Sequence, residues 1–322
     1  MSMIVDEVAV LGLGTMGHGI AQRFALAGCR VHCYDQQATV RDSLVDRCGA
    51  NLDAMAEADV IDASQIEETI GRLDVCLDEA DAVGPAQFVT EAVREDLGVK
   101  RDLFLRLESL VGSETILASN TSTFPMTQIA ESMNMPERAI DTHWFNPPHL
   151  VPLVEVIPGA RTSEETIAAT MKLLEFIGKM PIRLNKEVPG FVVNRIQVAM
   201  MREVWDLCER GVASKEDIDR AVRGSVGLRL AVTGPITVWD FAGIDICSAV
   251  YQNLAPDLRA DGKLPEVPRK LVEADRFGVK SGRGAFDYPP QEREAKRSDR
   301  DRNYLALLKQ LHSGVAPGAR SG

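Results

Sequence analysis

The sequence predicts an α/β protein in which a doubly wound, largely parallel sheet is followed by a second, all-helical domain. Up to about residue 187, short apolar runs of β type alternate with helical stretches, as in doubly wound sheets. From Pro189-Gly190 onward, apolar residues recur at helical spacing, and no convincing strand follows. Because 322 residues exceed the usual size of one hydrophobic core, we expect two domains, 1–187 and 188–322.

A βαβ unit opens the chain. The apolar run 7–11 ends in glycines, a helical stretch covers 16–26, and a second β-type run follows at 30–34. Later β-type runs alternate with helical stretches, which favours parallel pairing in one sheet. These runs lie at 88–90, 115–118, 139–142 and 151–157.

Later helix boundaries are also predicted. A Ser or Thr that precedes a Glu by three residues is typical of a capping box at a helix start. The two capping boxes are Ser64 with Glu67 and Thr162 with Glu165. The segment 191–209 has apolar residues at helical spacing and is expected to begin the second domain. The tail after Pro289 is rich in charged residues, and we expect it to be exposed and frayed.

The composition is that of an ordinary folded protein, with 45% hydrophobic and 26% charged residues. A net charge of -11 would repel nucleic acid and anionic lipid, so we expect the protein to bind neither nucleic acid nor membranes. The acidic start of the chain and the lack of a long apolar run speak against secretion and membrane insertion. The six cysteines show neither a CxxC pair nor zinc-ligand spacing, so we expect no metal site and a cytoplasmic protein.

A glycine-rich motif between the first strand and the first helix predicts a dinucleotide site. In a GxGxxG motif, the first glycine permits a tight turn and the second lets the backbone approach a pyrophosphate. The third glycine allows the helix to pack closely on the strand, and the free amides of the helix N-terminus attract the phosphates. The motif consists of Gly12, Leu13, Gly14, Thr15, Met16 and Gly17.

Asp35 closes the second predicted strand, 18 residues after Gly17. At this position an acid accepts hydrogen bonds from both hydroxyls of an adenosine ribose. Asp35 would repel a 2′-phosphate, and Gln36 and Gln37 place no cation directly after it, so we expect the cofactor to be NAD. An FAD site and a glycine turn that binds no nucleotide are the alternatives.

Seven further segments carry a recognisable pattern: 118–123 (Ala-Ser-Asn-Thr-Ser-Thr), 143–149 (His-Trp-Phe-Asn-Pro-Pro-His), 152–155, 189–195, 234–235, 240–243 and 280–284. Together they resemble the L-3-hydroxyacyl-CoA dehydrogenase family over nearly the whole chain. The resemblance implies a Rossmann domain that binds NAD, a helical C-terminal domain that holds substrate and forms a homodimer, and a role in fatty acid metabolism.

The resemblance implies that His143 is the catalytic histidine and that Glu155 is its carboxylate partner. Oxidation of an alcohol releases the hydroxyl proton, which an imidazole accepts readily near neutral pH. A carboxylate would hold the ring tautomer and stabilise the imidazolium. The family pattern also places Ser122 and Asn194 on the reacting oxygen of the substrate. It places four more residues in the cofactor cleft: Glu91, Lys100, Asn120 and Asn146.

The other histidines have weaker claims to a function. His149 either lines the substrate pocket or closes the turn at Pro147-Pro148, and both interpretations stay open. We expect His18, His32 and His312 to be structural or exposed.

Two segments depart from the pattern of the CoA-using enzymes. Residues 42–62 hold six acids against one basic residue, Arg47, where the CoA enzymes carry a lysine-rich helical hairpin. An acidic flap disfavours a ligand with several phosphate charges, unless these acids form a solvated helix face and CoA lies elsewhere. The longer segment 227–235 is similar to that of gulonate, carnitine and pyridine-carboxylate dehydrogenases. Within it, Arg229 either clamps a substrate carboxylate or lies at a surface.

The sequence therefore predicts an NAD-dependent dehydrogenase that oxidises the secondary alcohol of a 3-hydroxy acid or a short 3-hydroxyacyl-CoA. A dehydrogenase of a small carboxylate without CoA, of the gulonate, carnitine or pyridine-carboxylate type, is the first alternative. A non-catalytic, crystallin-like protein that binds a dinucleotide is the second. The presence of His143, Glu155, Ser122 and Asn194 together argues against this second alternative.

Overall fold

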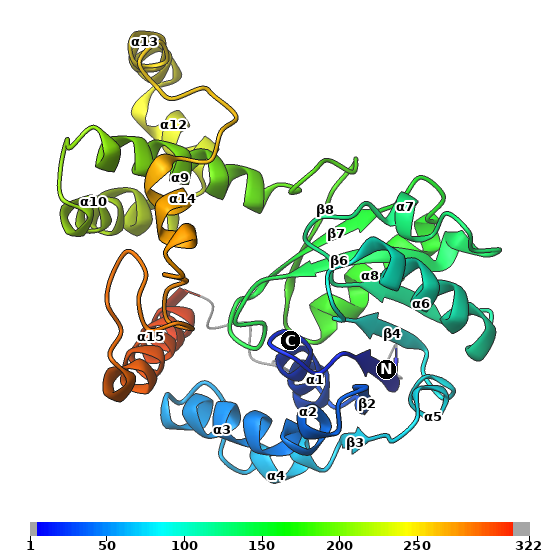
Figure 1. Ribbon diagram of the computed structural model, residues 1–322. Helices are drawn as coiled ribbons and strands as arrows, with labels where there is room; N and C mark the ends of the chain where they lie inside the picture. Colours follow the sequence, from blue (N-terminus) through cyan, green and yellow to red (C-terminus); the bar gives the residue numbers. More distant parts are fainter. Residues whose placement is uncertain (1–4, 312–322) are drawn as a thin grey trace. The chain divides into compact units, whose positions relative to one another are not determined.

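The computed structural model describes residues 5–311, which form two compact units. The first unit includes the described residues up to Val192 and those from Arg302 to Leu311, and the second unit is Val193–Asp301. The first unit holds the sheet, and the second unit is helical (Figure 1). The domain boundary expected from the sequence, between 187 and 188, lies five residues before this division.

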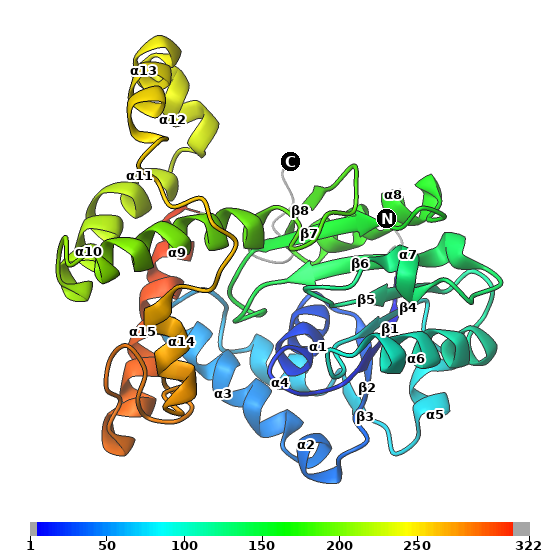
Figure 2. The same ribbon diagram turned by 45° about the horizontal axis from the view of Figure 1, so that its top comes forward.

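An eight-stranded sheet forms the centre of the first unit, in the order β3-β2-β1-β4-β5-β6-β7-β8 (Figure 2). Neighbouring strands are parallel except β6 and β7, which are antiparallel. The predicted doubly wound, largely parallel sheet is thus confirmed, and the short edge strands β3 and β8 extend it. The strands are β1 (Glu7–Leu11), β2 (Arg30–Tyr34), β3 (Leu73–Val75), β4 (Phe88–Glu91), β5 (Ile116–Ser119), β6 (Ala139–Trp144), β7 (Leu153–Pro158) and β8 (Met180–Arg183).

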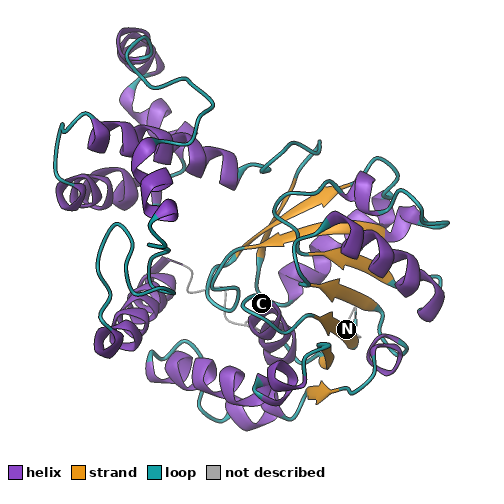
Figure 3. Cartoon of the chain, viewed as in Figure 1, coloured by secondary structure: helices purple, strands orange, loops and turns teal. Residues whose placement is uncertain are grey.

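Helices cover both faces of this sheet (Figure 3), because side chains point to alternate faces along each strand. On β1, Val8 and Val10 belong to one core cluster, and Ala9 and Leu11 belong to another. The first cluster includes residues of α1 (Gly17–Leu26), α3 (Leu44–Glu57) and α8 (Glu164–Phe176). The second includes residues of α5 (Glu79–Val83), α6 (Leu97–Leu110) and α7 (Met126–Ile129). Three short helices complete the unit: α2 (Ala38–Asp42), α4 (Gln65–Ile70) and η1 (Pro136–Arg138).

The second unit is built from helices. After β8, the described residues pair in β fashion only through isolated bridges at Gly278, Arg283 and Asp287. The elements are α9 (Val193–Glu209), α10 (Lys215–Ala221), the π-helix η2 (Val222–Gly227), α11 (Leu228–Leu230), α12 (Pro235–Ala242), α13 (Ile244–Leu254), α14 (Glu266–Glu273) and α15 (Pro290–Leu311), whose last turns belong to the first unit.

Residues 290–311 of the charged tail after Pro289 form a helix, α15, which corrects the expectation of fraying for this part of the tail. The rest of the tail lies outside the described residues. In the part of α15 that belongs to the first unit, Leu305 is buried in a cluster with Leu26 and Leu52. Lys309 forms an ion pair with Asp59 at 3.0 Å. The sequence does not reveal this attachment, because one leucine among many charges has no periodic apolar pattern around it.

Neither capping box forms as predicted. Ser64 precedes α4, but its backbone is already helical (φ -62°, ψ -20°), and its hydroxyl donates to Asp62. Ser163, not Thr162, caps α8 through its side chain, and Thr162 donates to the carbonyl of Ala139 instead. A capping side chain requires an extended backbone at its own residue, which spacing in the sequence does not report.

No described helix is both long and apolar enough to span a bilayer. Between residues 5 and 311, no three His, Cys, Asp or Glu side chains gather as they would around a metal ion. All six cysteines are free thiols.

Candidate active site

The glycine loop between β1 and α1 has the geometry that a dinucleotide pyrophosphate needs. Gly12 adopts φ +84°, and a Cβ at this residue would lie 2.7 Å from the carbonyl oxygen of Ala92. A Cβ on Gly17 would lie 1.7 Å from the carbonyl oxygen of Gly12, so α1 can begin this close to the turn only with glycine there. A Cβ on Gly14 would meet nothing within 4 Å, so the outer side of this residue is open to a ligand.

A cleft of about 810 Å³ runs beside the loop and reaches Asp35, just after β2. Asp35 is held in place because its Oδ2 accepts from the amide of Leu13 (2.8 Å) and its Oδ1 from the amide of Gln37 (2.9 Å). Thr15 and Met16 connect the glycine loop to the first residue of α1. A carboxylate for ribose hydroxyls and a bare backbone for the phosphates fit the two ends of an ADP-ribose group, as NAD requires.

His143 and Glu155 form a buried dyad across two strands. They lie directly opposite each other on the antiparallel strands β6 and β7, so their side chains share one face of the sheet. Nδ1 of His143 is 2.7 Å from Oε2 of Glu155, and their side chains are 4% and 0% exposed. Oε1 of Glu155 accepts from the amide of Val192 at 2.9 Å. The carboxylate therefore holds the proton on Nδ1 and leaves Nε2 as the basic nitrogen.

Ser122 lies on the basic side of the histidine. Its Oγ is 3.0 Å from Nε2 of His143. The rings of Phe145 and Phe191 pack at 4.5 Å and 5.4 Å from the imidazole, measured between centroids. Phe191 is buried with a φ of +51°, which is unusual for a residue other than glycine. The sequence interpretation assigned no role to either aromatic residue.

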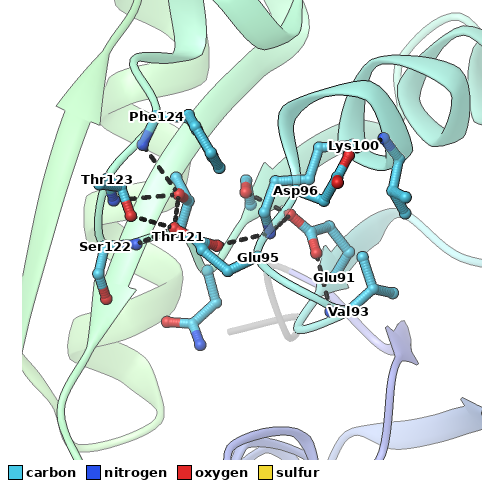
Figure 4. Close-up of polar contacts among 12 residues, drawn as sticks. Glu91, Val93, Glu95, Asp96, Lys100, Thr121, Ser122, Thr123 and Phe124 are labelled. Carbon is cyan, nitrogen blue, oxygen red and sulfur yellow. Dashed lines mark hydrogen bonds and ion pairs between the residues drawn. The ribbon is translucent and has the colours of Figure 1, made fainter. Parts of the chain in front are cut away.

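Glu95 organises the turn that carries Ser122 (Figure 4). Its Oε1 accepts from the hydroxyls of Thr121 and Thr123, both at 2.6 Å, and from the amide of Ser122 at 3.1 Å. Partial burial alone would raise the pKa of Glu95, but the two threonine hydrogen bonds and the charge of Lys100 outweigh it, and the pKa is lowered. Sequence reasoning missed Glu95, because only the fold brings it close to residues 121–123.

Glu91 and Lys100 lie beneath this turn. Both side chains are 0% exposed, and Nζ of Lys100 is 2.7 Å from Oε1 of Glu91 and 3.4 Å from Oε2 of Glu95. Glu91 also accepts from the hydroxyl of Ser119 and from the amide of Val93. Each neutralises the other's charge in the core. The expected contact of Glu91 and Lys100 with the cofactor stays a prediction.

Asn120 and Asn146 lie at the ends of neighbouring strands. Oδ1 of Asn120, just after β5, accepts from the amide of Trp144 at 3.0 Å, which ties this residue to β6. Asn146 is exposed two residues after β6 and precedes a cis peptide bond to Pro147. Their contacts with the cofactor stay predictions.

The other histidines have partners outside the dyad. His18 Nδ1 is 2.8 Å from the carbonyl oxygen of Gly14, and its ring lies 6.3 Å from that of His149. His32 forms a hydrogen bond with Glu7 at 2.6 Å. His312 lies outside the described residues.

Asn194 and Arg229 belong to the second unit. Asn194 lies in the first turn of α9, and Arg229 lies in α11, where it donates to the carbonyl and hydroxyl of Ser225 at 3.4 Å. Their roles toward the substrate stay predictions.

Both parts of the chain match known domains. Residues 7–188 match the NAD binding domain of 3-hydroxyacyl-CoA dehydrogenase, and residues 190–288 match its C-terminal domain.

Individual relatives agree with these matches. The chain is 39% identical to 5-formyl-3-hydroxy-2-methylpyridine 4-carboxylate 5-dehydrogenase of Mesorhizobium japonicum, over 96% of this chain and 99% of the relative. A crystal structure of the 5-dehydrogenase of this compound, described as an NAD+ dependent dismutase, has a TM-score of 0.87 at 37% identity and covers 96% of this chain and 99% of its own. The structure of (S)-3-hydroxybutyryl-CoA dehydrogenase from Ralstonia eutropha has a TM-score of 0.72 at 31% identity, with coverages of 88% and 99%.

The fold, the glycine loop and the matched domains lead to one conclusion. This chain is an NAD-dependent dehydrogenase that acts on CH–OH groups, and it belongs to the 3-hydroxyacyl-CoA dehydrogenase family.

Proposed function

We propose that this dehydrogenase oxidises the CH–OH group of a small free carboxylate rather than that of a CoA thioester. Free 3-hydroxy acids and substrates of the pyridine-carboxylate type both belong to this class. The chemistry rests on the hydrogen-bonded series Ser122, His143 and Glu155, in which the one basic nitrogen faces a hydroxyl. The exposed acidic surface of α3 sets the substrate class.

In the proposed reaction, Nε2 of His143 accepts the proton of the substrate hydroxyl, because Nδ1 donates to Glu155. Ser122 Oγ lies within hydrogen-bond distance of the same nitrogen and is placed to orient the substrate oxygen beside it. When His143 takes up the proton, the buried carboxylate of Glu155 stabilises the imidazolium. NAD, when bound, accepts the hydride from the carbinol carbon.

The acidic surface of α3 argues against CoA. Asp46, Asp53 and Glu57 are exposed, and no described lysine or arginine forms an ion pair with any of them. The phosphates of CoA carry several negative charges, so an uncompensated acidic helix would repel them.

The relatives favour the same class. The structure of the pyridine-carboxylate dehydrogenase superposes more closely than that of the hydroxybutyryl-CoA dehydrogenase. We further propose that Arg229 binds the substrate carboxylate and that Asn194 binds the reacting oxygen. The hydrogen bonds of Arg229 to Ser225 are long, so a bidentate carboxylate would compete with them effectively.

NAD reduction by the purified protein tests the proposal against 3-hydroxybutyryl-CoA, 3-hydroxybutyrate, gulonate, carnitine and hydroxymethyl-pyridine carboxylates. We expect the best free carboxylate to exceed the CoA thioester at least about tenfold in kcat/KM. The triple variant Asp46→Lys, Asp53→Lys and Glu57→Lys should raise kcat/KM for the thioester while leaving that for the free acid unchanged. Activity confined to the thioester would contradict the proposal.

A homodimer formed through the second unit is part of this proposal. Ile236 and Phe241 on α12 are 79% and 84% exposed, and Val232 is 74% exposed. Large apolar side chains this exposed are typical of protein interfaces. Sedimentation should give about twice the chain mass of 35.2 kDa, and Phe241→Asp should shift the protein toward the monomer.

A further inference from the structure

We propose that Arg47, on α3, binds the pyrophosphate of NAD at the edge of the glycine loop. The GxGxxG motif itself offers only backbone amides and the N-terminus of α1 to the phosphates. Arg47 is the one basic residue between positions 42 and 62, and the segment is otherwise acidic. A single cation in an otherwise acidic segment suggests a specific role for Arg47.

The Arg47 side chain reaches from α3 to the glycine that leaves room for a ligand. Its Nη1 donates to the carbonyl oxygen of Gly14 at 3.3 Å. Gly14 also lines the nucleotide cleft, which continues to Asp35. A dinucleotide whose ribose is bound by Asp35 would pass its pyrophosphate over Gly14, and this places the phosphates beside the Arg47 guanidinium.

The charge of Arg47 is not neutralised by the chain. Its three hydrogen bonds all go to neutral carbonyls: Nε donates to Ser43 (3.3 Å), Nη1 to Gly14 (3.3 Å) and Nη2 to Val40 (3.1 Å). No carboxylate among residues 5–311 forms an ion pair with it. A guanidinium has five N–H donors, so two are left after these three bonds. A half-buried, pre-oriented guanidinium with two donors left is well suited to a phosphate.

Other arginines near the nucleotide site are either paired with a carboxylate, placed at the ribose end or largely exposed. Arg106 forms a bidentate pair with Glu79, and Arg41 donates to the carbonyl of Asp35, at the ribose end. Arg94 lines the cleft but is 77% exposed. Arg47 donates directly to a residue of the glycine motif, Gly14.

Calorimetric titration with NADH and with ADP-ribose tests this role, because both ligands contain the pyrophosphate. We expect Arg47→Gln to raise the Kd for both ligands about tenfold, the loss of one charge-assisted contact. Arg47→Lys keeps the charge but not the planar fork, so it should give an intermediate Kd. Adenosine lacks the pyrophosphate, so its Kd, measured by competition with NADH, should be the same in the wild type and both variants.

Arg72→Gln is a matched control. Arg72 also donates from a guanidinium to a backbone carbonyl of α1, that of Ala25 at 3.5 Å, but at the opposite end of the helix. This variant should leave the Kd for NADH unchanged. Salt gives a second readout: between about 50 and about 500 mM KCl, NADH binding should weaken more for the wild type than for Arg47→Gln.

Two results would overturn the proposal. One is a Kd for NADH in Arg47→Gln that lies within about twofold of the wild-type value. If only Arg47→Lys folds, the same result in that variant decides. The other is weaker adenosine binding by the same factor as ADP-ribose, since this would show that Arg47 only maintains the junction between α2 and α3, where Val40 and Ser43 lie.

Discussion

At the nucleotide end of the active site the backbone of the glycine loop forms the binding surface, whereas at the reaction end buried side chains form it. The loop depends on the absence of side chains, since a Cβ on Gly12 or Gly17 would collide with nearby backbone. The dyad depends on hydrogen-bond direction, since Glu155 fixes which nitrogen of His143 is basic. NAD binding at the first end should therefore be sensitive to added side-chain volume. Turnover at the second end should be sensitive to the loss of a group that transfers protons.

The two ends also differ in how far apart their residues lie in the sequence. The loop and Asp35 come from one βαβ unit, within residues 12–35. The reaction end combines β6, β7 and the turn after β5, and it is held together by the antiparallel pairing of His143 with Glu155. If this contrast is correct, substitutions at one end should leave the function of the other intact.

The largest effect is expected for His143→Gln. The amide keeps much of the size of the imidazole and can donate to Glu155, but it cannot accept the proton of the substrate. We predict a fall in kcat of roughly 10²- to 10⁴-fold with an unchanged Kd for NADH. Steady-state NAD reduction and fluorescence titration with NADH measure the two quantities. Turnover near that of the wild type would remove the imidazole from the mechanism.

Gly14→Ala and Gly17→Ala should distinguish a glycine that leaves room for the ligand from a glycine that the fold requires. An alanine Cβ at position 14 meets no protein atom, so this variant should keep its Tm and lose NADH affinity by about 10²-fold. At position 17 the Cβ would lie 1.7 Å from the carbonyl of Gly12, so this variant should lose both affinity and thermal stability. Equal Tm values for the two variants would contradict the steric argument.

Asp35→Ala should relax the preference against NADP. The carboxylate is held by the amides of Leu13 and Gln37, and its loss removes both the ribose acceptor and the repulsion of a 2′-phosphate. We expect the ratio of kcat/KM for NAD to that for NADP to fall about tenfold or more, with the kcat for NAD less affected. An unchanged ratio would show that Asp35 does not contact the ribose.

The smallest effect, on stability, is expected for Asp141→Asn on β6. Burial, together with the charges of Glu187 and Glu91, raises the pKa of Asp141 well above its ordinary value. The unfolded carboxyl titrates near about 4. Above this pH the folded state retains a proton that the unfolded state has lost, so the wild type loses stability as pH rises through the folded pKa.

Asn cannot ionise, so Asp141→Asn removes this loss. The Tm of the variant minus that of the wild type should increase between about pH 4 and about pH 8, by a few degrees for each kcal/mol involved. Thermal scans at several pH values measure the difference, and a constant value would contradict the assignment to Asp141.

Prediction from the sequence succeeded where neighbours in the chain are neighbours in space. The βαβ unit and the alternation of apolar runs depend on local periodicity, so the sheet was predicted without knowledge of its strand order. The capping boxes at Ser64 and Thr162 were wrong, although α4 does begin directly after Ser64, because side-chain capping depends on contacts that spacing does not report. The family resemblance supplied His143 and Glu155, which no local pattern could have paired.

The sequence by itself determined the fold class, the cofactor and the position of the glycine loop, because contiguous residues with direct steric roles encode them. Only the tertiary structure decided that Lys100 forms a buried ion pair with Glu91 and that Glu95 holds the turn at Ser122. It also decided that Arg47 reaches Gly14 without a counter-ion. Each of these contacts joins elements distant in the chain, and their charges and hydrogen bonds depend on how those elements pack.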